Sequence, residues 1–93
     1  MARFLVEQTF AAAQPVGVAG ESGWQTKFER LTEDGVGWVR SYVSIDRRRV
    51  LTICDARDAA AVRQAVARVG WPIDRITEVQ VCDLTGGDER GTP

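Results

Sequence analysis

Two segments in the middle of the chain decide the fold: Val-Gly-Trp-Val-Arg-Ser-Tyr-Val-Ser at 36–44 and Arg-Val-Leu-Thr-Ile-Cys-Asp at 49–55. Apolar and polar residues alternate along both segments, as they do in half-buried β-strands. Asp46, Arg47 and Arg48 lie between the segments and predict the tip of a hairpin. The two strands are therefore expected to pair with each other, and the remaining elements flank them on both sides.

Two helices are predicted, one before the hairpin and one after it. The first begins near Glu21, with Ser22 as its N-cap, and ends before Gly35. The second is capped by Asp58 and ends at Gly70. Each helix carries an apolar stripe, formed by Trp24, Phe28 and Leu31 in the first and by Val62, Val66 and Val69 in the second. We expect both stripes to pack on one sheet.

The outer strands are predicted at residues 3–10 and 76–83, where the alternation recurs. The order strand, helix, strand, strand, helix, strand is that of the ferredoxin-like fold. The right-handed crossover rule favours the spatial order fourth, first, third, second, with both helices on one face. The sequence thus predicts one α+β domain at residues 1–84 with a four-stranded antiparallel sheet. The polar, glycine-rich residues 85–93 are expected to form a flexible tail.

Polar and aromatic side chains are predicted to gather on the sheet face that the helices leave open. By strand alternation this set is Glu7, Thr9, Trp38, Arg40, Tyr42, Thr52, Cys54, Glu78, Gln80 and Cys82. A slip of one residue in any strand would move its members to the other face. Two such sheets packed face to face would form a dimeric α+β barrel with this set inside. The mixture of carboxylates, guanidinium, phenol and indole fits a ligand pocket better than a surface facing water.

The composition excludes several functions. The chain has 93 residues and a formal net charge of −1, which argues against nucleic-acid and membrane-surface binding. No apolar run approaches the roughly 20 residues of a membrane span. The apolar stretch at the start of the sequence is too short for a signal peptide, so we expect a cytoplasmic protein. Its two cysteines are then expected to be free thiols. The absence of histidine excludes Ser-His-Asp and Cys-His catalysis and histidine metal ligands.

Four residues of the predicted face suggest acid–base chemistry without a cofactor or a metal. Glu7 and Glu78 are expected on neighbouring strands, where two close carboxylates cannot both ionise cheaply. Arg40 would hold one of them ionised, and Tyr42 would donate to a carbonyl or an oxyanion. The cavity would be shaped by Trp38, Thr9, Thr52, Gln80 and Cys54. The hypothesis is an isomerase, cyclase or dehydratase acting on a carbonyl-bearing metabolite.

The blocks Trp-Val-Arg-Ser-Tyr-Val-Ser at 38–44 and Asp-Arg-Ile-Thr-Glu-Val at 74–79 resemble a family of small bacterial proteins. The resemblance extends over roughly residues 3–83. That family includes a nickel-binding protein, and the resemblance implies a ferredoxin-like fold and a homodimeric α+β barrel. A histidine usually stands there at the position of Arg40, and a cysteine at that of Thr52. Since nickel relies on such nitrogen and sulfur donors, nickel is an alternative here and not the expected cofactor.

Three functions remain open from the sequence. The first is the acid–base enzyme, the second is a nickel or other transition-metal-binding protein without catalysis, and the third is a protein that binds a small ligand without converting it. Pocket chemistry and pocket binding use the same residue types, so the sequence does not separate the first from the third.

Overall fold

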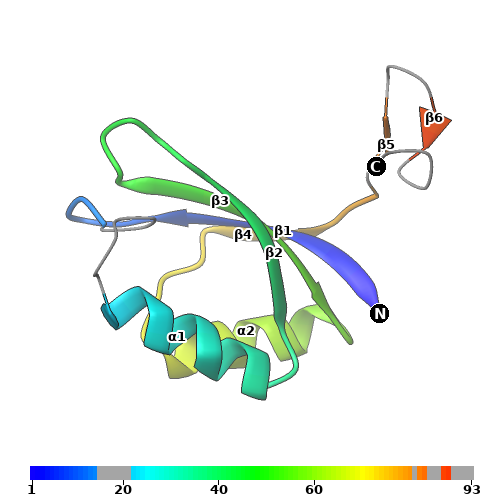
Figure 1. Cartoon of the computed structure of the whole chain (residues 1–93), viewed down its shortest axis with the longest axis horizontal. Coiled ribbons are helices and arrows are strands. Elements are labelled where there is room, and N and C mark those ends of the chain that lie inside the picture. The colour runs from blue at the N-terminus through cyan, green and yellow to red at the C-terminus, as the bar shows by residue number, and fades with distance from the viewer. Residues whose placement is uncertain (15–21, 81, 84–86, 89–93) are drawn as a thin grey trace.

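The computed structural model describes residues 1–14, 22–80, 82–83 and 87–88. Four strands form the main sheet in the order β2-β3-β1-β4, and every neighbouring pair is antiparallel. These strands are β1 (Ala2–Thr9), β2 (Gly37–Val43), β3 (Arg49–Ala56) and β4 (Arg75–Glu78). The helices α1 (Ser22–Glu33) and α2 (Ala59–Arg68) both lie on one side of this sheet (Figure 1). The predicted ferredoxin-like α+β fold and strand order are confirmed.

The helices end where the sequence predicted. Asp58 is the N-cap of α2, and its carboxylate accepts a hydrogen bond of 2.8 Å from the backbone N–H of Ala61. That bond lowers the pKa of Asp58. Gly35 and Gly70, which follow α1 and α2, have φ of 85° and 78° and so occupy the left-handed region that glycine enters without strain. Neither helix is long and apolar enough to cross a membrane.

The core lies between the helices and one face of the sheet. Leu31 of α1 and Val62 and Val66 of α2 are fully buried, as the predicted stripes require. The sheet contributes Phe4, Val6, Val50, Cys54 and Ala56, and the connections contribute Phe10, Val36 and Trp71. The predicted N-cap Ser22 and the predicted stripe residue Trp24 have side chains outside the described part of the structure.

The predicted fourth strand, 76–83, is wrong in its second half. The strand ends at Glu78, and Cys82–Asp83 forms β5, which pairs with β6 (Gly87–Asp88) in a separate two-stranded sheet. The register explains the break, because Glu78 pairs with Phe4 only two residues from the start of β1. A strand continuing to Cys82 would therefore have no partner in β1. Of the predicted tail 85–93, only residues 87–88 are described.

Candidate functional site: the open sheet face

The sheet face opposite the helices is open, and β1 presents to it the residues that alternation predicted. Phe4, Val6 and Gln8 are buried on the helix side, so Glu7 and Thr9 lie on the open side. The Thr9 hydroxyl donates a hydrogen bond of 2.6 Å to the Asp74 carboxylate, just before β4. The predicted placement of Glu7 and Thr9 on the open face is confirmed.

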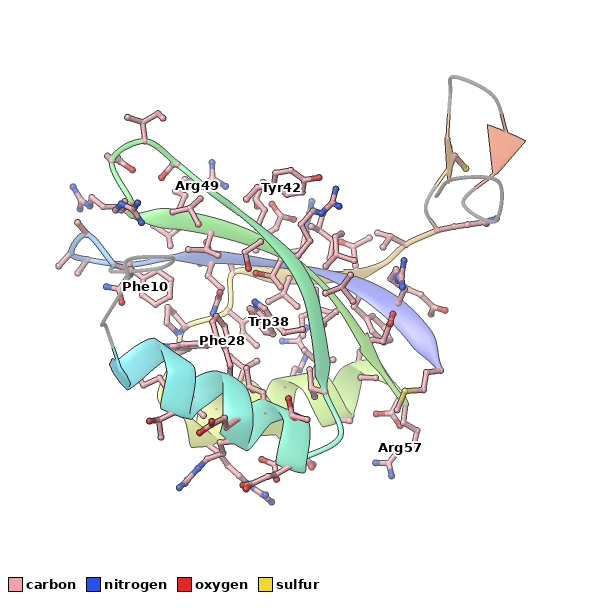
Figure 2. The ribbon with its side chains drawn as sticks, in the orientation of Figure 1. Phe10, Phe28, Trp38, Tyr42, Arg49 and Arg57 are labelled. Atoms are coloured by element: carbon pink, nitrogen blue, oxygen red, sulfur yellow. The ribbon has the colours of Figure 1, made fainter. Side chains whose placement is uncertain are left out.

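A β-bulge in β2 divides the three residues that alternation had grouped together. Trp38 pairs with Cys54, whereas Arg40 pairs with Ile53, and the register shifts between them. The extra residue changes the phase of the strand. Arg40 and Tyr42 therefore lie on the open face as predicted, but the predicted place of Trp38 in the pocket is wrong. Figure 2 shows Trp38 between the sheet and the helices, beside Phe28, and Tyr42 on the other side.

Trp38 belongs to an aromatic cluster in the core. Its ring centroid lies 5.8 Å from that of Phe28 and 5.8 Å from that of Trp71, and the Phe28 and Trp71 centroids are 6.0 Å apart. The Lys27 ammonium lies 5.4 Å from the centroid of Trp71. The cluster joins α1, β2 and the segment after α2, which explains why Trp38 faces the helices.

The prediction that Thr52 and Cys54 of β3 face the open side of the sheet is also wrong. Thr52 and Cys54 are both fully buried on the helix side, and Leu51 and Ile53 lie on the open side. The Thr52 hydroxyl is 2.7 Å from the Ser41 hydroxyl, and Ser41 accepts a hydrogen bond of 2.8 Å from the Trp38 indole N–H. This chain of hydrogen bonds satisfies a polar residue in the core, so the polarity of Thr52 did not indicate the open face.

Glu78 does not join Glu7. Glu78 pairs with Phe4, whose side chain faces the helices, so Glu78 also projects to the helix side, at the exposed end of β4. Glu7 pairs with Arg75 and projects to the open side. The two carboxylates project from opposite faces and are three register positions apart, or about 10 Å along the strands. The predicted acid–base pair is therefore not formed within one chain. Gln80 and Cys82 lie beyond the end of β4 and are exposed, so neither belongs to the open face.

The open face combines an apolar stripe with charged residues around it. The central strands contribute Leu5, Leu51 and Ile53, and Tyr42 of β2 extends the stripe, so we call these four residues the apolar stripe. Glu7 lies beside the stripe on β1. Arginines surround it at Arg3, Arg40, Arg49 and Arg75.

The arginines differ in their partners. Arg3 forms a two-point ion pair with Asp55, with N–O distances of 2.8 and 3.1 Å, and these hydrogen bonds lower the pKa of Asp55. The side chains of Arg40, Arg49 and Arg75 make no hydrogen bond or ion pair within the described residues. Alternation did not single out Arg49 or Arg75, because both stand at the first position of a strand.

Among the residues that the structure describes, two hollows adjoin this face. One has a volume of about 230 Å³ and is lined by Tyr42, Val43, Ser44, Arg49 and Leu51, at the hairpin end of β2 and β3. The other, of about 460 Å³, lies at the far end of the sheet and includes the Arg3–Asp55 pair together with Glu78 and Gln80. Glu78, predicted as catalytic, and Gln80, predicted as ligand-binding, thus line a hollow, but it is not the one that Tyr42 lines.

The donors present do not fit a nickel ion within one chain. The chain has no histidine, and among the described residues no three Cys, Asp or Glu side chains lie close enough to hold a metal. Cys54 is fully buried, and burial raises the pKa of its thiol to about 11, so the thiolate that a metal requires is disfavoured. Cys82 is free and exposed on β5.

The fold and this face define a class of small α+β proteins with two helices on one side of a four-stranded antiparallel sheet and an open surface on the other. The family described as nickel responsive protein SCO4226-like matches residues 4–79, and the chain belongs to this family. The crystal structure of SCO4226 from Streptomyces coelicolor A3(2) has the same fold, with a TM-score of 0.70 and 16% identity. The match covers 88% of this chain and 100% of that one. No curated protein sequence matches.

Proposed function

We propose that this protein is a non-catalytic binding protein that works as a homodimer, with the open sheet faces of two copies enclosing a chamber for a small ligand. The observation that carries the proposal is the apolar stripe on the face that no element of the described chain covers. Membership of a nickel-responsive family supports a binding role. The separation of Glu7 from Glu78 removes the support for acid–base catalysis within one chain.

The composition of the face suits an interface between two copies. Strands of up to eight residues, at about 3.3 Å per residue and about 4.8 Å apart, give a surface of roughly 20 by 26 Å. Because side chains protrude from this surface, its accessible area is larger and comes nearer to the roughly 800 Å² that each partner buries in a stable complex. Tyr42 is 57% exposed, and tyrosine and arginine are typical of interfaces. Both signs of charge are present, so Glu7 of one copy can approach an arginine of the other.

The dimer is tested by sedimentation of Ile53→Asp beside its control Ile45→Asp. Ile53 lies in the stripe, whereas Ile45 is fully exposed at the hairpin tip. We expect the unmodified protein and Ile45→Asp to sediment as dimers. The dimer of Ile53→Asp should dissociate at least about 100-fold more readily, because the carboxylate placed in the apolar stripe must lose its water when the two faces pack, even with Arg40 of its own sheet opposite it. A monomeric unmodified protein, or two variants that associate equally, would refute the proposal. Circular dichroism shows whether each variant is folded.

Nickel association is the second candidate function, and the family match is the observation that favours it. Because the donors do not fit, we expect calorimetric titration of the reduced protein with nickel chloride to show no tight, stoichiometric binding. The control is Cys82→Ser, which removes the exposed thiol, beside Cys54→Ser, which alters the buried one. Stoichiometric binding that either substitution abolishes would establish nickel as the ligand instead.

A further inference from the structure

We infer that the hairpin end of the open face binds a small organic carboxylate, with Arg49 holding the anion and Tyr42 and Leu51 contacting its apolar part. The inference rests on the proposed function and deepens it, because it names the class of ligand that the face accepts.

Arg49, Tyr42 and Leu51 line one hollow at the hairpin end of β2 and β3. Tyr42 and Leu51 stand directly opposite each other on β2 and β3, and Arg49 lies two residues before Leu51 on the same face. Such diagonal neighbours are about 7–8 Å apart, within reach of an arginine side chain. Arg40 lies two residues from Tyr42 on the side away from Arg49, opposite Ile53, and is not among the residues that line this hollow. Figure 2 shows Tyr42 and Arg49 side by side on the side of the sheet away from the helices.

The guanidinium of Arg49 makes no hydrogen bond or ion pair within the described residues, so it is available to an anion. Arg3 is neutralised by Asp55, and Arg75 stands directly across from Glu7 in the register. Glu7 is the carboxylate diagonally across from Arg49 on the open face, and no ion pair joins the two side chains. Asp46 lies nearest to Arg49 along the chain, but the Ser44 hydroxyl and the backbone N–H of Arg48 already bind its carboxylate at 2.6 and 3.0 Å.

The chemistry of these side chains selects a carboxylate over a cation. A guanidinium is planar and presents paired N–H donors that match the two oxygens of a carboxylate. A guanidinium without an ion-pair partner repels a metal ion at the same place. The hollow of about 230 Å³ has room for a ring as well as an acid group, and Leu51 and the exposed ring of Tyr42 provide the apolar contact.

The test is a nuclear magnetic resonance titration with sodium benzoate at neutral pH, beside its neutral analogue benzamide. We expect benzoate to shift the backbone amides of Tyr42 and Leu51 in a saturable manner, and benzamide to leave them in place. Arg49→Gln should weaken benzoate binding by roughly tenfold or more, because a charge-assisted hydrogen bond is lost. The matched control is Arg63→Gln, which removes the same charge from the exposed surface of α2 and should leave the affinity unchanged.

The outcomes separate this inference from the dimer. Equal binding of benzamide, or equal benzoate affinity in Arg49→Gln and Arg63→Gln, would overturn the carboxylate site. A sedimenting dimer that shows no saturable benzoate binding would overturn it too and leave the dimer standing. A monomer that binds benzoate through Arg49 would confirm the carboxylate site and refute the dimer.

Discussion

Replacement of Trp71 by alanine should lower the free energy of unfolding by about 3–5 kcal/mol, the range found when a large buried aromatic side chain is truncated. Trp71 is 6% exposed and meets both Phe28 and Trp38 through its ring. The truncation removes these contacts and the cation–π contact with Lys27. It also leaves a cavity at the point where three elements meet.

Such a loss is large for a chain of 93 residues. Domains of this size bury a limited core, and a total stability of about 5–15 kcal/mol is typical. Urea unfolding followed by far-ultraviolet circular dichroism measures the change without relying on tryptophan fluorescence. Trp71→Phe keeps a ring in the cluster and should recover a large part of the stability. A loss below about 1 kcal/mol in Trp71→Ala would mean that the cluster does not hold the helices on the sheet.

The order of the elements could be predicted because its signals are local. The N-cap Asp58 and the glycines that follow each helix are recognisable from a few neighbouring residues. In β1, one side of the strand is clearly more apolar than the other, so its alternation assigned the faces correctly. The right-handed crossover rule then fixed the strand order.

The faces of β3, of β4 and of Trp38 at the start of β2 could not be predicted, because the deciding facts are not local. In β3 both phases are largely apolar, with Leu51 and Ile53 on one side and Val50 and Cys54 on the other. Only the pairing of β3 with β1 selects the buried set. The bulge that turns Trp38 inward also leaves no mark on the pattern of apolar and polar residues. Of the predicted site, Glu7, Thr9, Arg40 and Tyr42 lie on the open face, and Trp38, Thr52, Cys54 and Glu78 do not.

The substitution Ser41→Ala tests the buried hydrogen-bond chain that keeps Trp38 and Thr52 inside. Ser41 accepts from the Trp38 indole at 2.8 Å and lies 2.7 Å from the Thr52 hydroxyl, so its loss breaks both links. We expect the free energy of unfolding to fall by about 1–3 kcal/mol, since two polar groups would lose their partners in the core. Thermal and urea unfolding measure this change.

Comparing three substitutions tests whether the Thr52 side chain lies in the core. Thr52→Val removes one hydroxyl without changing the shape of the side chain, so its cost should be smaller than that of Ser41→Ala but still about 1 kcal/mol. The matched control is Thr77→Val on the exposed edge strand β4, where a change within about 0.5 kcal/mol is expected. If Thr52 faced a ligand chamber instead, Thr52→Val and Thr77→Val would be equally mild. The order Ser41→Ala, Thr52→Val, Thr77→Val therefore distinguishes a core network from a pocket wall.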